Sequence, residues 1–420
     1  MIRTIATAAT ANLAMQLVSV VLGVLIGIVL SHLLGADGLG VYAFAMSLSM
    51  LLATGARMGL TTLVVREVAV GQERGAWPEV VGLVSWSQRA TAVVATCIGV
   101  VTLAVASLTA SPQTFWTLTA AMVMLVLMTA TTLRSSAIRG LNAVVLASVP
   151  LLLLRPACAL LGIGVLYAMS LDDPYLAMST QAVAWAVAGV AALAFWQRRL
   201  PVQPTQLVST PRAWLVAAMP ILLLDGLLVT IHQSDILMLK WLSTDASTGI
   251  YSIVAQMGRF TALVLMVANS VVSPRFAALH EAGNKDDLQK LVRMSARTVT
   301  LLTALLAVSL VVFGRFALSF YAPGFEIGYP ALVVLVIGQA ANAMAGSVGY
   351  LLIMTGHDRD VAWVSVGVAL LNFVLNVTLI PTYDMFGAAV ASAISVALWN
   401  LALVILVRIR LGINSTVATL

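Results

Sequence analysis

Charged side chains are scarce in this chain of 420 residues, because Asp, Glu, Lys and Arg together make up only 9% of it. Soluble globular domains carry about 25% charged residues. With 61% hydrophobic residues, the chain has too few polar side chains to cover the surface of a water-soluble fold of this size. The composition therefore excludes a soluble globular protein and predicts a polytopic membrane protein.

Cysteine and histidine are also rare, with two and four copies respectively. Cys97 and Cys158 both lie inside apolar stretches, where cysteine behaves as a small hydrophobic residue. Their spacing matches neither a disulfide framework nor a metal site, so we expect no metal and no cofactor. The sequence also lacks a nucleophile–base pattern and a glycine-rich phosphate loop. We therefore assign no catalytic residue and do not expect an enzyme.

Twelve apolar segments are each long enough to cross a bilayer as a helix, which takes about 20 residues. They lack the period-two alternation of strands, and lipid offers the backbone no hydrogen-bond partners, so an all-α membrane fold is expected. The segments are 9–33, 40–64, 80–106, 115–133, 142–168, 175–196, 213–239, 249–272, 295–318, 329–355, 361–380 and 386–407.

The basic residues are unevenly distributed along these segments. Of the 22 Lys and Arg, 17 lie at the termini or in the even-numbered loops, and only Lys240 and Arg315 lie in the odd-numbered loops. By the positive-inside rule, both termini are cytoplasmic. The excess of +6 is therefore explained by topology, and we do not expect nucleic-acid binding.

The chain repeats a segment at half its length. LLGADGLGVYAFAMSLSMLLATGARMGLTTLVVREVA, from Leu33, and WLSTDASTGIYSIVAQMGRFTALVLMVANSVVSPRFAA, from Trp241, share identities at a constant offset of 209 residues. The shared identities are Gly40 and Gly249, Tyr42 and Tyr251, Ala53 and Ala262, Arg66 and Arg275, and Ala69 and Ala278.

The proline-rich stretch QRRLPVQPTQLVSTPR, from Gln197, follows the sixth segment. We predict an N-terminal six-helix half (1–197), a cytoplasmic linker (198–212) and a C-terminal six-helix half (213–420). Six helices in each half make the two copies parallel, and such repeats place a substrate site in a central cleft between them.

Charged residues inside a membrane span cost at least about 2.5–3.5 kcal/mol each, so each needs a reason. Span 213–239 carries three ionisable residues near one another, and span 9–33, at the same place in the first half, carries two amides four residues apart. Arginine stays charged at mid-membrane and grips phosphate through two bonds, so three arginines within spans favour an anionic ligand. The predicted substrate-binding residues are Arg155, Arg259, Arg57, Asn12 and Gln16, and the predicted coupling or gating residues are Asp225, His232 and Asp235.

A structural interpretation of the same residues stays open. Arg155 or Arg259 could pair with Asp225 or Asp235 to hold helices together, and His232 could be a hydrogen-bonded interhelical residue. Asn372 and Asn376 on one span, and Gln339 and Asn342 on another, could equally be interhelical contacts. Pro156 and Pro220 predict kinks in their helices.

Particular motifs resemble the Wzx-type oligosaccharide flippases and polysaccharide biosynthesis proteins, within the multidrug/oligosaccharidyl-lipid/polysaccharide exporter superfamily. One is Leu34-Gly35-Ala36-Asp37-Gly38-Leu39-Gly40-Val41-Tyr42, followed by Arg66-Glu67 at the end of the second span. Another is NFVLNVTLIPTYDMFGAAVASAISVALWN, from Asn372, in which Pro381 ends one span and Gly387-Ala388-Ala389 opens the next.

The resemblance implies a transporter that moves a polyprenyl-pyrophosphate-linked oligosaccharide to the periplasmic leaflet of a bacterial inner membrane by alternating access. Lipopolysaccharide or exopolysaccharide export would be the setting. The implied partners are the lipid-linked oligosaccharide, membrane lipids, and a polymerase and glycosyltransferases of the same pathway. Two rivals remain. One is a proton- or cation-coupled multidrug exporter of the same superfamily, and the other is a polysaccharide polymerase or ligase, against which the short outer loops argue.

Overall fold

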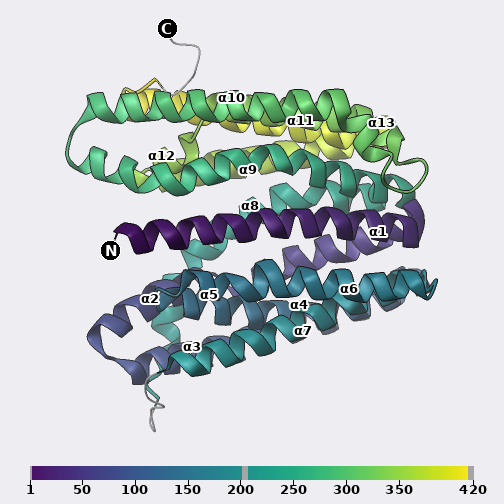
Figure 1. Ribbon diagram of the computed structural model, residues 1–420, viewed down its shortest axis with the longest axis horizontal. Helices are drawn as coiled ribbons and strands as arrows, with labels where there is room; N and C mark the ends of the chain where they lie inside the picture. The colour runs from purple at the N-terminus through teal and green to yellow at the C-terminus, as the bar shows by residue number, and fades with distance from the viewer. Residues whose placement is uncertain (1, 201–206, 415–420) are drawn as a thin grey trace. The chain divides into compact units, whose positions relative to one another are not determined.

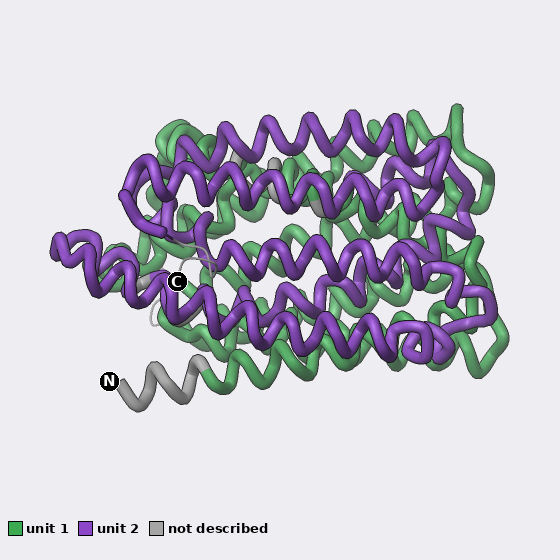
Figure 2. Tube along the Cα trace, turned by 90° about the horizontal axis from the view of Figure 1, so that it is seen from above, with its two compact units in different colours: residues 1–233 green, residues 234–420 purple. Residues whose placement is uncertain are grey.

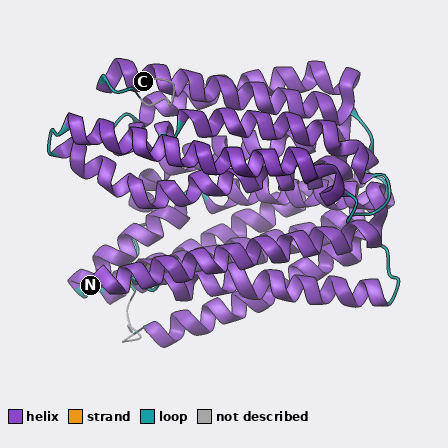
Figure 3. Cartoon of the chain, turned by 45° about the horizontal axis from the view of Figure 1, so that its top comes forward, coloured by secondary structure: helices purple, strands orange, loops and turns teal. Residues whose placement is uncertain are grey.

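The structure is a computed structural model that describes residues 2–200 and 207–414 of the chain. The side chains of residues 2–9, 223–225, 227–228, 232, 270–271 and 274 lie outside the described set. The described part of the chain is built from helices and short connections and contains no strand (Figure 3). The expected all-α class is therefore confirmed.

The chain forms two compact units, residues 1–233 and 234–420, which are coloured separately in Figure 2. The boundary between the units lies within helix α8. The division predicted at the 198–212 linker stays a prediction, and residues 201–206 of that linker lie outside the described residues. The two units are described separately below.

Unit 1 is built around α4, which contacts α1, α2, α3 and α7. This helix is buried on several sides because its small and apolar residues allow close approach of its neighbours. The helices of unit 1, labelled in Figure 1, are α1 (Ile2–Arg57), α2 (Leu60–Arg74), α3 (Trp77–Thr109), α4 (Pro112–Gly140), α5 (Val144–Val149), η1 (Pro150–Leu154), α6 (Arg155–Ala168), α7 (Pro174–Arg199) and most of α8 (Pro211–Leu242).

Unit 2 is built around α11, which contacts α9, α10 and α13. The last turns of α8 also belong to it. Its remaining helices are α9 (Asp245–Glu281), α10 (Lys285–Leu318), η2 (Phe325–Gly328), α11 (Tyr329–Ala345), α12 (Val348–Met354) and α13 (Asp358–Leu411).

Among the described residues, nine helices are long and apolar enough to cross a membrane. Two of the nine contain an internal bend: α1 at Gly35 and α13 at Asp384. Each bend separates two of the predicted spans. The twelve predicted spans are largely helical, with interruptions at Met58–Gly59 in span 40–64, at Asn142–Ala143 at the start of span 142–168 and at Gly346–Ser347 in span 329–355. The chain is therefore a multi-pass membrane protein, while the count of twelve stays a prediction because α8 is not among the nine.

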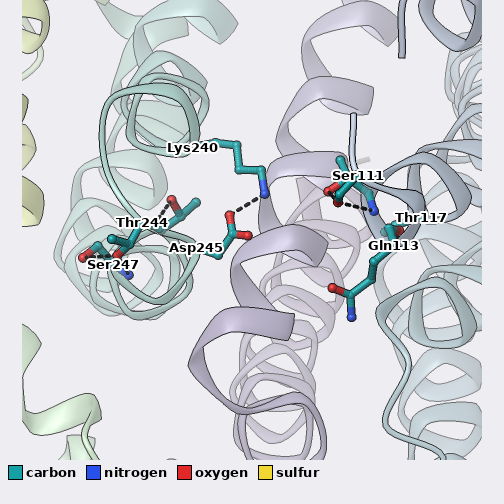
Figure 4. A network of polar contacts seen from close by, with 9 residues as sticks. Ser111, Gln113, Thr117, Lys240, Thr244, Asp245 and Ser247 are labelled. Carbon is teal, nitrogen blue, oxygen red and sulfur yellow. Dashed lines mark hydrogen bonds and ion pairs between the residues drawn. The ribbon is translucent and has the colours of Figure 1, made fainter. Parts of the chain in front are cut away.

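The helix ends are capped as their sequences predict. Ser111 and Thr244 accept hydrogen bonds from the backbone N–H three residues later, at 3.3 Å and 3.2 Å, and so begin α4 and α9 (Figure 4). Lys240 near the end of α8 forms an ion pair with Asp245 in the first turn of α9 (Figure 4). At the start of α10, hydrogen bonds from Lys290 and from the cap residue Asn284 lower the pKa of the exposed Asp287 carboxyl.

Large apolar side chains are exposed along the outer faces of the long helices. On α10 they recur every three or four residues, which places them on one helical face. An apolar face of this size in contact with water would be unstable, whereas lipid solvates it. The exposed residues on α10 are Leu301, Leu305, Val308, Val312 and Phe316, and those on α3 are Val93, Val100, Val101, Val105 and Leu108.

The backbone differs around the two prolines at which kinks are predicted, Pro156 and Pro220. The segment Pro150–Leu154 is a π-helix that leads directly into Arg155 and Pro156. Proline has no N–H to continue the α-helical hydrogen bonding, so Pro156 favours a wider turn at this place. The sequence predicts a kink at the same position. Pro220 lies inside α8, which continues through it as a helix.

The bend in α13 is made by Asp384, whose φ is 54°, a left-handed value that is uncommon for residues other than glycine. The Asp384 carboxylate accepts hydrogen bonds from the hydroxyl groups of Ser243 and Ser247, one on each of its oxygens. These bonds from the α8–α9 connection stabilise the bend and therefore the position at which the last span of unit 2 begins.

The described end of the linker packs against α3. Val208 donates a backbone hydrogen bond to the Pro78 carbonyl at 3.3 Å, and a Cβ added to Gly82 would lie 2.0 Å from the Val208 carbonyl oxygen. Only glycine allows the linker to approach the helix this closely. Beside this contact, Trp86 and Trp214 pack with ring centroids 5.5 Å apart.

Candidate functional site

In unit 2, the buried Asp235 is the centre of a network of hydrogen bonds. The Tyr251 hydroxyl donates to its Oδ2 at 2.8 Å, the Asn376 Nδ2 donates to its Oδ1 at 2.8 Å, and the Ser392 hydroxyl also donates to Oδ2. The donors come from α9 and from both arms of the bent α13. A buried carboxylate without such partners would cost several kcal/mol, so these donors explain why this acid is tolerated inside a membrane span.

Two asparagines of α13 extend this network. The Asn372 Oδ1 accepts from the Ser234 hydroxyl at 2.9 Å and from the Asn376 Nδ2 at 3.1 Å. The Asn372 Nδ2 and the Asn376 Oδ1 are buried and have no partner. Buried polar groups are nearly always hydrogen-bonded, so an unsatisfied donor and acceptor beside Asp235 leave capacity for a further polar group.

Arg259 lies on α9, two turns after Tyr251, and its side chain is exposed. Its charge acts on the Tyr251 hydroxyl, and among the described residues it takes part in no ion pair. The structural alternative in which Arg259 pairs with Asp235 is therefore wrong, because Asp235 is held by neutral donors instead.

In unit 1, Arg155 at the start of α6 lies over the ring of Trp185 on α7. The guanidinium carbon is 5.2 Å from the ring centroid, a cation–π contact. Gln181, one turn before Trp185 on the same helix, and Arg155 both interact with the Tyr42 hydroxyl. Like Arg259, Arg155 forms no ion pair within the described part of the chain. Its alternative pairing with Asp225 stays a prediction, because the Asp225 side chain lies outside the described residues.

Two side chains of this unit 1 cluster have unused hydrogen-bonding groups. The Gln181 Oε1 and the Trp185 Nε1 have no partner, although the two residues are only 3% and 8% exposed. Leaving a buried polar group unsatisfied costs about 1–3 kcal/mol. Within the described set of side chains, the cluster therefore offers one free acceptor and one free donor beside a cation that forms no ion pair.

The two clusters correspond through the sequence repeat. Tyr42 and Tyr251, which are 209 residues apart, are both buried, and each interacts with an arginine of its own unit. Each tyrosine also meets a polar residue from the last span of its half, Gln181 in one unit and Ser392 in the other. The tyrosines correspond through the repeat, whereas the arginines do not, because Arg155 comes from α6 and Arg259 from α9. Among the described side chains of the two clusters, the one carboxylate is that of Asp235.

The remaining predicted residues are placed as follows. Arg57, at the end of α1, donates to the Thr54 Oγ1 at 2.9 Å. Asn12 on α1 accepts from the Ser148 hydroxyl of α5 at 2.7 Å, and Gln16 is half-buried on the same helix. The side chains of Asp225 and His232 lie outside the described residues. The substrate and coupling roles of all eight residues stay predictions.

Several residues of the two clusters were missed by sequence reasoning. Tyr42 and Tyr251 were found as members of the repeat without a role, and Asn372 and Asn376 were placed among interhelical contacts. Gln181, Trp185 and Ser392 carry no signal in the sequence that separates them from the many small polar and aromatic residues of the spans. In the described residues no three His, Cys, Asp or Glu side chains gather in a metal-binding group.

A cavity of about 610 Å³ also lies in unit 1, on the side of α3 where the linker packs. It is mostly apolar, and it is lined among others by Trp86, Arg89, Leu207 and Leu215. None of the predicted site residues lines the cavity, although Arg57 is the sequence neighbour of Met58, which does. We therefore place the candidate site at the two polar clusters.

The sequence matches the model of a family described as polysaccharide biosynthesis protein over residues 5–280. The chain belongs to this polysaccharide biosynthesis protein family. None of the curated proteins matches the sequence. The resemblance to polysaccharide biosynthesis proteins inferred from the sequence motifs is thereby confirmed.

Solved structures of the MOP superfamily share the fold of this family member. The inward-facing conformation of a multidrug resistance MATE family transporter has a TM-score of 0.76 at 13% identity and covers 96% of this chain and 98% of that one. The lipid II flippase MurJ, in an inward closed conformation, gives 0.73 at 11% identity, with 96% and 87% covered. A MOP superfamily transporter from Pyrococcus furiosus gives 0.66 at 12% identity, with 97% and 94% covered.

The chain is therefore a multi-pass membrane protein of the polysaccharide biosynthesis protein family, with the fold that these transporters and flippases have. At such low identity the solved structures show the fold alone. The substrate must therefore be argued from the residues of this chain.

Proposed function

We propose that this protein is a flippase that moves a polyprenyl-pyrophosphate-linked oligosaccharide from the cytoplasmic to the periplasmic leaflet of a bacterial inner membrane. The observation that carries the proposal is that Arg155 and Arg259 have no ion-pair partner among the described residues. Both lie within membrane spans, and neither forms an ion pair among the described residues. A cation in such a place is costly unless an anionic ligand uses it, and a lipid-linked diphosphate is such an anion.

The proposed mechanism is alternating access, in which one six-helix half moves against the other around a substrate bound in a central cleft. The sugar and the diphosphate cannot cross hydrocarbon unaided, so they would pass along hydrated, cationic helix faces while the prenyl chain stays in lipid. Both termini would be cytoplasmic, as the distribution of Lys and Arg predicts. Membrane lipids, a polymerase and glycosyltransferases of the same pathway would be the partners.

Asp235 is proposed as the coupling residue of this transport cycle. Its carboxylate binds donors from α9 and from both arms of α13, so a proton or small cation that replaced one donor would change how these elements pack. Asp225 and His232 are proposed to act with it, since they share α8. Arg57, Asn12 and Gln16 are proposed as further substrate contacts.

The function is tested by reconstituting the full chain in proteoliposomes that contain a polyprenyl-diphosphate-linked oligosaccharide. A lectin or glycosidase added outside measures how fast the internal oligosaccharide becomes accessible. We expect the protein to raise this rate at least about tenfold over empty liposomes, and we expect the double variant Arg155→Ala with Arg259→Ala to abolish the gain. An unchanged rate with the double variant would remove the anionic-cleft proposal, and no gain with the starting protein would remove the flippase.

A second candidate function is a proton- or cation-coupled multidrug exporter. Two observations favour it: the buried carboxylate of Asp235 and the structural similarity to a multidrug resistance MATE family transporter. The test is uptake of a cationic dye into vesicles under a proton gradient. Gradient-dependent uptake that disappears in the Asp225→Asn variant would favour the exporter over the flippase.

A further inference from the structure

We propose that the cluster of Arg155, Trp185, Gln181 and Tyr42 in unit 1 is a binding site for an acidic sugar, meaning a saccharide that carries an oxyanion next to a hydroxyl group. This inference rests on the proposed function and names the chemistry that one half of the transporter recognises.

The ligand class follows from the groups that the cluster leaves unused. The Arg155 guanidinium has five N–H donors, and no carboxylate among the described residues pairs with it. The Trp185 Nε1–H is a second buried donor without an acceptor, on the same residue whose ring packs under the guanidinium. Two donor groups, one of them cationic, suit the oxygens of a carboxylate or a phosphate.

Gln181 requires a hydrogen-bond donor on the ligand, whereas Arg155 and Trp185 require acceptors. Its Oε1 is a buried acceptor without a donor, and the residue lies one helical turn before Trp185, so both side chains project from the same face of α7. A simple inorganic anion at neutral pH has few protons to donate to this oxygen, whereas a sugar has a hydroxyl close to its acidic group. The three unused groups together therefore favour a sugar acid or a sugar phosphate over a bare anion or a neutral sugar.

The backbone positions these groups firmly. The π-helical turn at Pro150–Leu154 sets the direction from which Arg155 leaves the start of α6. The Thr131 hydroxyl donates to the Trp185 carbonyl at 3.3 Å, which ties α7 to the central helix α4 at the level of the indole. Tyr42 is 7% exposed on α1 and closes the cluster on the side of Gln181. The four residues of the site therefore all lie in helices, namely α1, α6 and α7, rather than in a loop.

The corresponding cluster of unit 2 has a different composition. There the tyrosine donates its hydroxyl to a carboxylate, so an approaching anion would meet a negative charge. Among the described side chains of unit 1, no acidic residue pairs with Arg155, and the group that meets Tyr42 is the Gln181 amide. The Asp235 carboxylate beside Tyr251 disfavours an anion in unit 2, so the acidic sugar is assigned to the cluster around Tyr42 in unit 1.

The test measures binding of three probes to the purified full-length protein in nanodiscs by isothermal titration calorimetry. D-glucuronate carries a carboxylate, α-D-glucose 1-phosphate carries a phosphate, and D-glucose carries neither. We expect at least one of the acidic sugars to bind about tenfold or more tightly than glucose. The stronger of the two identifies whether the oxyanion comes from a sugar acid or from the phosphate that links the sugar to its carrier.

Single variants then locate the binding in the cluster. Arg155→Gln should weaken the preferred acidic sugar about tenfold or more, and Trp185→Phe, which keeps the ring under Arg155 but removes the Nε1–H, about threefold or more. Gln181→Glu places a negative charge in the site and should abolish binding of the acidic sugar. The matched controls are Trp116→Phe and Arg139→Gln, on exposed positions of α4, which should bind within about twofold of the starting protein.

The inference is overturned if glucose binds as tightly as both acidic sugars, if no probe binds, or if both Trp185→Phe and Gln181→Glu leave the affinity unchanged. Unchanged unfolding temperatures show that a loss of binding is not a loss of fold. Because the liposome assay measures flipping independently of these probes, a failed binding test with intact flipping removes the sugar site and leaves the proposed function standing.

Discussion

Tyr251 donates its hydroxyl hydrogen bond to Asp235 across 2.8 Å, and both side chains are buried in unit 2. Tyr42, the repeat partner of Tyr251, meets the Gln181 amide and the Arg155 charge instead. An arginine charge acts on both tyrosines, but the same tyrosine position meets a carboxylate in unit 2 and an amide in unit 1. This difference separates the two tasks of the proposed transporter, coupling in unit 2 and binding of the anionic substrate in unit 1.

The first prediction concerns the Tyr251 hydroxyl. Tyr251→Phe keeps the ring and removes one donor from a buried carboxylate, so it should lower the free energy of unfolding by about 2 kcal/mol. The measurement is the thermal unfolding midpoint of the purified protein in detergent. Tyr167→Phe, at an exposed position, is the control and should leave the midpoint unchanged. Equal midpoints for the two variants would show that the bond contributes nothing to stability.

The second prediction concerns coupling through Asp235. Asp235→Asn keeps the size of the side chain and removes the charge, so transport should lose its dependence on an ion gradient while binding of substrate is retained. Flipping rates are compared in liposomes with and without a proton gradient and a sodium gradient. Asp172→Asn, in the exposed turn before α7, is the control. Gradient dependence that persists in Asp235→Asn would exclude this residue as the coupling group.

The third prediction concerns the contact of the linker with α3. Gly82→Ala places a Cβ 2.0 Å from the Val208 carbonyl oxygen, so the end of the linker must leave the helix. We expect faster proteolysis within residues 207–210 and a lower flipping rate, because the start of α8 is no longer held. Gly164→Ala is the matched control, since a Cβ there meets no atom within 4 Å. Identical protease patterns for the two variants would show that the contact does not restrain the linker.

The fourth prediction concerns the bend at Asp384. Asp384→Ala removes the acceptor for Ser243 and Ser247 and keeps a Cβ in the left-handed region, so it should lower the free energy of unfolding by about 2–4 kcal/mol. Asp384→Gly loses the same hydrogen bonds but relieves the backbone strain, so its loss should be smaller by about 1 kcal/mol. Unfolding midpoints of the two variants test the order. A glycine variant less stable than the alanine variant would contradict it.

Much of the fold could be predicted from local pattern. Each predicted span is largely helical because an apolar run of about 20 residues in lipid can satisfy its backbone only within itself. The bends at Gly35 and Asp384 fall between predicted spans, where LLGADG and PTYDMFG contain residues that tolerate turns. Hydropathy alone carries this information because each helix forms its hydrogen bonds with its own neighbours in sequence.

The candidate site could be predicted only in part. Charge and depth identified Arg155, Arg259 and Asp235, because an ionisable residue in a span is rare enough to stand out. Their partners did not stand out. Trp185 is one of nine tryptophans, and Ser392 is one of many small residues in an apolar helix. Such residues acquire a role only from the side chain that packing places opposite them.

The amino-acid sequence by itself determined that this chain is a helical membrane protein and that its halves repeat a segment that contains a tyrosine, Tyr42 in one half and Tyr251 in the other. Only the tertiary structure decided that Asp235 binds Tyr251, Asn376 and Ser392 rather than an arginine, and that Trp185 lies beneath Arg155. The physical reason is the separation in sequence between the residues that each interaction joins. Burial in lipid acts on each segment independently, whereas hydrogen bonds and cation–π contacts join residues that are distant in sequence and meet only when the helices pack.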